Sequence, residues 1–199
     1  MSEAVPFVDL RAVQRPLHDQ LNAAFQRVLQ HGRYVLGPEV AAFETQLAQY
    51  TGHSHAIGVS SGTDALLATF LALDYAPGDE VITTPFTFIS TATSVLRAGL
   101  RPVFVDLPED AHHPVAAQIE AAIGPKTRAV LVVHLFGEPL DLTAIKVLCD
   151  AHGLDLIEDC AQAIGARHTD GRHVGRTGRA GTLSFFPAKN LGALGDGGA

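Results

Sequence analysis

The sequence lacks clustered basic residues, closely spaced cysteines and long apolar runs. Its 14 lysines and arginines are scattered among 21 aspartates and glutamates, which gives a formal charge of −7. Because binding of a phosphate backbone usually requires grouped basic side chains, we expect no nucleic-acid partner. The two cysteines are Cys149 and Cys160, and Cys160 lies in an apolar stretch, so we expect packed, reduced thiols.

Membrane and targeting signals are also missing from the sequence. No apolar run approaches the length of a membrane span, and the first residues, MSEAVPFVDL, lack the charged start and apolar core of a signal peptide. We therefore expect no membrane partner and a cytoplasmic protein. The histidines are scattered without an HExxH pattern, so the sequence predicts no metal site.

The N-terminal region has the apolar period of two helices. The first is expected to end at His31-Gly32, and its apolar positions recur at steps of three and four: Val13, Leu17, Leu21, Ala24, Phe25 and Val28. Pro38 suits the first turn of a second helix. The stripe that this helix is expected to bury consists of Val40, Phe43, Leu47 and Tyr50.

The rest of the chain alternates short apolar runs with segments of helix length. Strands that are apolar throughout and separated by helices are typical of a parallel sheet covered on both faces, so we predict an α/β domain with a mostly parallel sheet flanked by helices. The expected strands are Ala56–Val59, Glu80–Thr83, Pro102–Val105, Ala129–Val133 and Leu154–Ile157. The expected helices lie near Asp64–Leu73, Ile89–Ala98, Val115–Ile123 and Leu142–His152.

Ligands of open parallel sheets bind beyond the carboxyl ends of the strands, so the residues that follow each strand are candidate site residues. Ser61, Gly62 and Thr63 follow the first expected strand and open a helix. Gly62 permits close approach of the backbone, while the two hydroxyls lie beside unpaired helix N–H groups, a combination suited to a phosphate. An ordinary helix cap is the alternative.

Other strand ends carry further polar candidates. Asp159 and Gln162 follow a strand, and a buried carboxylate needs a partner such as a metal ion, a ribose hydroxyl or a protonated ring nitrogen, unless Asp159 only caps a helix. His134 is either a pocket residue or a packed core histidine. Lys189 follows an apolar run, and a lysine in a partly dry pocket becomes a nucleophile able to form a Schiff base, although most loop lysines are surface charges.

Together these features match the needs of pyridoxal phosphate (PLP), which requires a phosphate cradle, a carboxylate for its ring nitrogen and a Schiff-base lysine. The carboxylate keeps the ring nitrogen protonated, and the lysine holds the cofactor and moves protons to and from the substrate carbon. Phe88 follows the turn Thr83–Thr87 and would either stack on the cofactor ring or pack in the core. The sequence therefore predicts a PLP site.

Six segments resemble the DegT/DnrJ family of PLP-dependent nucleotide-sugar aminotransferases, which have the aspartate-aminotransferase fold (fold type I). They are GVSSGTDALL, GDEVITTPFTFISTAT, PVFVDL, TRAVLVVHLFG, IEDCAQAIGA and SFFPAKNLGALGDGG. The resemblance runs from about residue 7 to residue 199. It implies an N-terminal arm and helix over residues 1–30 and an incomplete PLP-binding large domain over residues 31–199. The family's C-terminal small domain would be absent, and the chain would be an N-terminal portion of a longer protein.

The resemblance also implies a role for each candidate residue. Lys189 would form the internal aldimine and act as the proton-shuttling base, Asp159 would pair with the pyridine nitrogen, and Gln162 would contact the O3′ side of the cofactor. The contacts to the phosphate and the ring face would come from Gly62, Thr63, Ser184 and Phe88. The implied reaction converts a nucleotide-linked keto-sugar to an amino-sugar, with glutamate as the usual amino donor, in a homodimer.

Two alternatives to this reaction remain open. A sugar dehydratase uses the same fold and cofactor, but such relatives carry histidine in place of the Schiff-base lysine, so Lys189 argues against it. A non-catalytic or truncated family member is the other alternative. The segment HGRYVLGPEVAAFE resembles members that aminate C3 of the sugar more than those that aminate C4. One departure is the stretch Gly178–Gly181, where many relatives carry a Gly-Asp pair.

Overall fold

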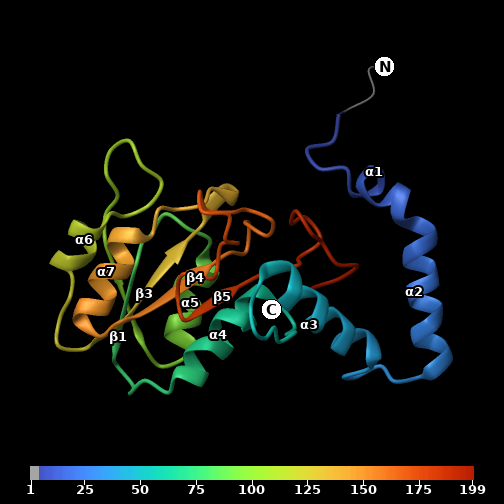
Figure 1. The fold of residues 1–199 in the computed structure, drawn as a ribbon, viewed down its shortest axis with the longest axis horizontal. Helices are drawn as coiled ribbons and strands as arrows, with labels where there is room; N and C mark the ends of the chain where they lie inside the picture. The colour runs from blue at the N-terminus through green and yellow to red at the C-terminus, as the bar shows by residue number, and fades with distance from the viewer. Residues whose placement is uncertain (1–4) are drawn as a thin grey trace.

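The computed structural model describes residues 5–199. At its centre lies a parallel five-stranded sheet in the order β2-β1-β3-β4-β5 (Figure 1). The strands are β1 Glu80–Thr83, β2 Arg101–Phe104, β3 Thr127–Val133, β4 Asp155–Asp159 and β5 Ala180–Thr182. Four of the predicted strands are therefore confirmed, each within about two residues of its expected bounds. The predicted α/β class with a parallel sheet is confirmed with them.

Helices cover both faces of the sheet, as the apolar character of its central strands requires. On one face, α4 (Gly62–Leu73) and α5 (Ile89–Arg97) pack against alternate strand residues such as Leu131. On the other face, α6 (Ala116–Ala121) and α7 (Thr143–His152) pack against the intervening residues, such as Val130. These four helices match the predicted ones closely, because caps and glycines define their ends locally.

The predicted strand Ala56–Val59 is wrong, and β5 was not predicted. Residues 56–58 have no assigned strand structure, and Val59 makes only an isolated antiparallel bridge to Gly198. Gly198 also bridges Ser184, so residues near the end of the chain lie between the two segments. A strand forms only where a partner satisfies its backbone groups, and apolar patterning cannot supply that partner. The short β5 is missed for the opposite reason: its sequence, AGT, has no apolar run.

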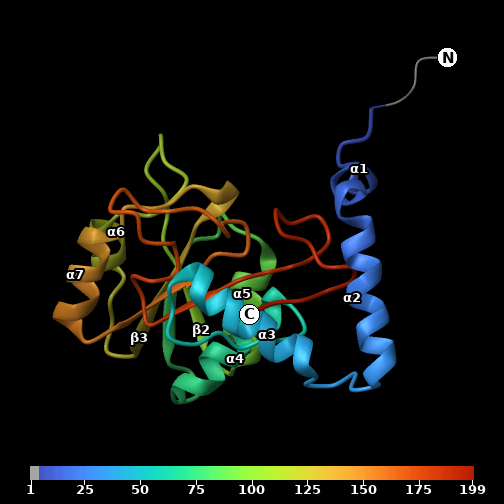
Figure 2. The same ribbon diagram turned by 45° about the vertical axis from the view of Figure 1, so that its right-hand side comes forward.

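The N-terminal region is helical as expected but is broken at Pro16. It forms α1 (Leu10–Gln14), a 3₁₀ turn η1 (Arg15–Leu17) and α2 (His18–His31), and α2 ends at Gly32 in the left-handed conformation. A proline inside a helix removes an N–H donor and clashes with the preceding turn, which explains the break. Figure 2 shows α2 standing beside the rest of the fold. None of its residues is buried.

The second predicted helix, α3 (Pro38–Thr51), begins at Pro38 as expected. Of its expected buried stripe, Leu47 is buried, and Val40 and Phe43 are partly buried. The prediction that Tyr50 is buried is wrong, because its side chain is 54% exposed. Within residues 5–199, no helix combines the length and the apolar character needed to cross a bilayer.

Candidate functional site

One cavity gathers all the residues that the sequence assigns to a PLP site. It has a volume of about 1070 Å³ and lies at the carboxyl end of the sheet, where β4 ends at Asp159. The predicted residues that line it are Gly62, Thr63, Phe88, Asp159, Gln162, Ser184 and Lys189. The first and last of them, Gly62 and Lys189, are more than 120 positions apart in the chain, so their convergence is a property of the tertiary structure.

The N-terminus of α4 forms a tight cradle on one wall of this cavity. Ser61 caps the helix by accepting a hydrogen bond from the Asp64 N–H at 3.1 Å, and the preceding N–H groups of Gly62 and Thr63 have no intrahelical acceptor. A Cβ atom at Gly62 would lie 2.6 Å from the Ser184 Cβ, so only glycine fits there. Gly198 packs still more closely, since a Cβ atom added there would lie 2.2 Å from the Ser61 carbonyl oxygen. The cradle is therefore fixed from three segments and suits an anion.

Asp159 lies at the end of β4 and is buried. Its Oδ1 accepts a hydrogen bond from the Ala161 N–H at 3.1 Å, and its Oδ2 accepts one from the Thr91 hydroxyl at 3.0 Å. Burial raises the pKa of Asp159, and these two hydrogen bonds, together with the charge of Lys189, offset only part of the rise. A cation that entered the cavity beside Asp159 would therefore be stabilised by a carboxylate that has few competing partners.

Lys189 and Phe88 also line the cavity. Lys189 is half-buried in the turn after Phe186, whose carbonyl accepts the Lys189 N–H at 2.8 Å. Phe88 is the residue before α5 and is 65% exposed, so its ring is available to the cavity and is not part of the core. Gln162 uses its side-chain oxygen to accept the Phe136 N–H at 2.8 Å.

Sequence reasoning missed several residues that contact this site. Thr91 binds Asp159 through its hydroxyl, and Ser90 lies 2.8 Å from the Thr63 hydroxyl. Both belong to α5. Thr91 lies three residues after Phe88, so the helical period offered a signal that placed it on the same side as Phe88, whereas Ser90, at a spacing of two, had no such signal. Phe136 also lines the cavity, and no pattern in the sequence distinguishes its ring from a core residue.

Glu158, the residue before Asp159, faces away from the cavity and organises the loop that follows. Its Oε2 accepts hydrogen bonds from His134 Nε2 at 2.9 Å and the Gly175 N–H at 2.8 Å. Its Oε1 accepts the N–H groups of Thr177 at 2.8 Å and Gly178 at 2.6 Å. Burial acts to raise the pKa of Glu158, but the hydrogen bonds from His134, Gly178 and Gly175 outweigh it and the pKa lies below its ordinary value.

His134 is a packed core histidine, which decides between the two roles considered for it. It is fully buried, and its Nδ1 accepts the Leu140 N–H at 3.1 Å, so its Nε2 carries the proton donated to Glu158. Polar atoms of His134, Glu158 and Cys160 lie within 4.8 Å of one another. The ring nitrogens and carboxylate oxygens already have hydrogen-bond partners, however, so this cluster offers no free set of metal ligands.

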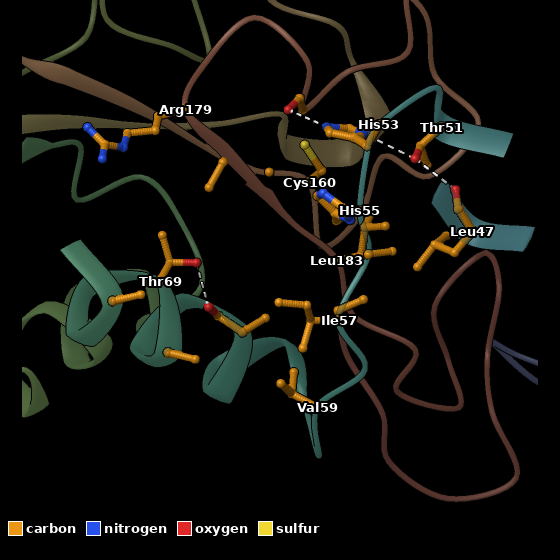
Figure 3. Close-up of a pocket in the computed structure, with 18 of the residues that line it drawn as sticks. Leu47, Thr51, His53, His55, Ile57, Val59, Thr69, Cys160, Arg179 and Leu183 are labelled. Carbon is orange, nitrogen blue, oxygen red and sulfur yellow. Dashed lines mark hydrogen bonds between the residues drawn. The ribbon is translucent and has the colours of Figure 1, made fainter. Parts of the chain in front are cut away.

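A second cavity, shown in Figure 3, is a groove of about 570 Å³ between α3, the segment 53–59, α4 and β5. Its wall is mainly apolar. His53 makes hydrogen bonds of 2.9 Å to the Thr51 hydroxyl and to the Gly175 carbonyl. Burial raises the pKa of Cys160 well above its ordinary value, so its thiol is a poor nucleophile. The chemistry-bearing residues lie in the first cavity.

The residues of the first cavity fit PLP. The glycine-floored cradle at α4 suits a phosphate, and the buried Asp159 carboxylate suits a protonated ring nitrogen. Lys189 is the only cationic side chain among the described residues that line the cavity. It lies close enough for its charge to lower the pKa of Asp159. The phosphate cradle, the carboxylate and the lysine therefore line the same cavity.

Curated relatives of the chain include two sugar aminotransferases. One is UDP-N-acetyl-3-dehydro-α-D-glucosamine 3-aminotransferase of Acidithiobacillus ferrooxidans, 49% identical over 98% of this chain and 53% of its own length. Another is dTDP-3-amino-3,4,6-trideoxy-α-D-glucose transaminase of Streptomyces venezuelae, 47% identical over 98% of this chain and 51% of its own length. The chain thus spans about half the length of the curated relatives it matches.

Solved structures agree with these relatives. DesV of S. venezuelae superposes with a TM-score of 0.93 at 45% identity, over 99% of this chain and 53% of DesV. NtdA of Bacillus subtilis, solved with bound cofactor PMP, superposes with a TM-score of 0.90 at 36% identity, over 100% of this chain and 45% of NtdA. Residues 16–199 match the DegT/DnrJ/EryC1/StrS aminotransferase family. The chain belongs to this family of PLP-dependent aminotransferases and has the fold of their solved structures.

Proposed function

We propose that this chain forms the cofactor-binding part of an aminotransferase that converts a nucleotide-linked keto-sugar to an amino-sugar, at C3 of the sugar, with glutamate as the amino donor. The observation that carries the proposal is the single cavity in which Lys189, Asp159 and the α4 cradle meet. The two sugar aminotransferases above, both named for position 3, support the substrate class and the ring position.

Each residue of the cavity has a proposed task. PLP, when bound, supplies an electron-withdrawing ring that stabilises negative charge on the substrate carbon. Lys189 anchors the cofactor covalently through Nζ and, when released, carries a proton to and from the reacting carbon. Asp159 holds a proton on the ring nitrogen by charge pairing, and the Thr91 hydroxyl orients Asp159. The phosphate is held by Gly62, Thr63 and Ser184, the ring face by Phe88 and the O3′ side by Gln162.

The dehydratase alternative loses support, because the relatives above are aminotransferases and Lys189 is present. We further propose that residues 1–30 form an arm and helix, of which residues 1–4 lie outside the described part of the chain. We also propose that residues 31–199 form an incomplete large domain and that the complete protein is cytoplasmic. Two observations support an incomplete domain: the chain spans about half the length of its relatives, and a groove separates segment 56–59 from β5.

The proposed homodimer is supported by the uncovered apolar residues of the N-terminal helices. Phe25 is 61% exposed and Leu29 is 46% exposed, on a helix that stands beside the fold (Figure 2). In the full-length protein, Phe25→Glu should raise the dimer dissociation constant by at least about tenfold. Sedimentation equilibrium measures this, and Gln26→Glu adds the same charge at the neighbouring exposed position as the control. Equal dissociation constants for both variants would contradict a dimer built on this face.

The proposed function is tested by adding PLP to the full-length protein and to the 199-residue chain. We expect a visible absorption band from bound cofactor, and borohydride reduction should attach the pyridoxyl group to the peptide that contains Lys189. Mass spectrometry of the digest locates the label. A full-length protein that shows no band and no label would refute the enzyme proposal. A label on the full-length protein alone would show that the shorter chain cannot hold the cofactor.

A further inference from the structure

The loop after β3 holds Phe136 in an unusual backbone conformation. Its φ of 58° and ψ of 12° place it in the left-handed region, inside the 3₁₀ turn η2 (Leu135–Gly137). Glycine adopts this region without strain, whereas a bulky side chain does so at a cost in free energy. The Gln162 side chain stabilises the turn, because its Oε1 accepts the Phe136 N–H at 2.8 Å. The surrounding structure therefore enforces a conformation that Phe136 does not prefer.

This conformation does not serve to bury the phenylalanine. The Phe136 side chain is 71% exposed, and it lines the cavity that contains Lys189. A strained backbone that presents an apolar ring to a binding cavity indicates a ligand contact more strongly than it indicates packing.

Two other rings lie beside Phe136, and we call the three residues Phe86, His112 and Phe136 the aromatic rim. The Phe136 ring meets Phe86 edge-on at 6.4 Å between centroids and His112 edge-on at 6.3 Å. Phe86 and His112 stack on each other at 5.9 Å with an angle of 25°. The three residues come from the loops after β1, β2 and β3, so the rim lies at the same end of the sheet as the cavity.

The charge of the cavity narrows the choice of ligand. Among the described residues that line it, Lys189 is the only cationic side chain, so these residues offer a substrate at most one ion pair. Glutamate offers two carboxylates and no ring. A nucleotide-linked sugar offers a hexose and a nucleobase, each with an apolar face that packs on an aromatic ring.

We propose that Phe136, supported by Phe86 and His112, stacks on a ring of the nucleotide-sugar and takes no part in binding the amino donor. The inference rests on the proposed function, because it assumes that the cavity accepts such a substrate. Phe136 is then a specificity residue for one of the two half-reactions.

The test compares Phe136→Gly with Phe136→Tyr in the PLP-loaded, full-length protein. Glycine removes the ring and relieves the backbone conformation, so the variant should fold, whereas tyrosine keeps a ring in place. Phe104→Ala is the matched control, since Phe104 is a phenylalanine 50% exposed on β2 and does not line the cavity. The probes are the nucleoside diphosphates UDP, dTDP, GDP and CDP and the corresponding hexose conjugates, measured by calorimetry. The glutamate half-reaction is followed from the cofactor absorbance.

We expect Phe136→Gly to weaken binding of the preferred hexose conjugate about tenfold, with Phe136→Tyr and Phe104→Ala within twofold of the wild type. The glutamate half-reaction should change less than twofold. If the free diphosphate weakens equally, the stacked ring is the nucleobase, and if it is unaffected, the ring is the hexose. Unchanged affinity for the conjugate, or equal losses in both half-reactions, would overturn the inference. A wild-type protein that binds PLP but none of the probes would overturn the nucleotide-sugar substrate itself.

Discussion

Replacing Lys189 by arginine in the full-length protein is expected to reduce transamination by roughly 10⁴-fold or more, because the residue is proposed both to anchor the cofactor and to transfer the proton. Arginine keeps a positive charge near Asp159 but has no amine that forms the covalent link. The charge that lowers the pKa of Asp159 is therefore retained while the chemistry is lost. Steady-state kinetics and the borohydride label on the Lys189 peptide measure the two effects separately.

The control for this variant is Lys146→Ala. Lys146 lies on α7 and pairs with Asp150 through a 2.6 Å contact at helical spacing, away from the cavity. Its removal should leave the rate within about twofold, since exposed pairs of this kind contribute little. A Lys189→Arg variant that retained more than about one-hundredth of the wild-type rate would contradict the proposed role. Loss of general acid–base catalysis alone typically lowers a rate by about 10²- to 10⁴-fold, so the loss of Lys189 should lower it by at least that much.

Asp159→Asn is expected to stabilise the protein without cofactor and to lower the transamination rate of the protein with cofactor. Burial raises the pKa of Asp159, so the folded protein without cofactor disfavours the ionised carboxylate. Because the folded state then binds the proton more tightly than the unfolded state, stability falls as pH rises from the unfolded pKa, about 3.9, through the raised folded pKa. Asparagine removes this penalty. At neutral pH the variant should gain on the order of 1 kcal/mol, which corresponds to a rise in Tm of about 2–4 °C.

With PLP bound, the same substitution should reduce the rate by at least about 10²-fold, because an amide cannot stabilise a proton on the ring nitrogen by charge pairing. Thermal melts without cofactor at pH 4 and pH 7.5, and kinetics with cofactor, measure the two effects. The difference in Tm should shrink at pH 4, because there the raised pKa keeps most of the folded-state carboxyl protonated, while the unfolded-state carboxyl is about half protonated. Asp110→Asn, in an exposed loop, is the control. A variant less stable than the wild type at pH 7.5 without cofactor would show that Asp159 stabilises the empty fold, contrary to the expectation.

Much of the sheet and the cavity could be predicted from local patterns. Strand β1 matches its expected bounds, and α4 begins beside its Ser61 cap, because apolar period and capping act over a few residues. Asp159 and Lys189 could be identified because each is a polar residue that follows an apolar run, and such residues fall at the ends of strands and in the loops beyond them. The expectation that they share one cavity rested on the rule that the carboxyl ends of parallel strands meet.

The sequence by itself determined the helices, four of the five strands and the side chains that are able to carry chemistry. The tertiary structure decided which of these side chains touch and which strand candidates are paired. Thr91 contacts Asp159 across 68 positions, and Glu158 binds N–H groups of residues 175–178, contacts that depend on how distant segments pack. The same dependence on distant residues explains segment 56–59 and Phe136. A strand forms only where a partner strand supplies hydrogen bonds, and a strained φ persists only where surrounding contacts hold it. Neither the partner nor those contacts can be deduced from the local sequence.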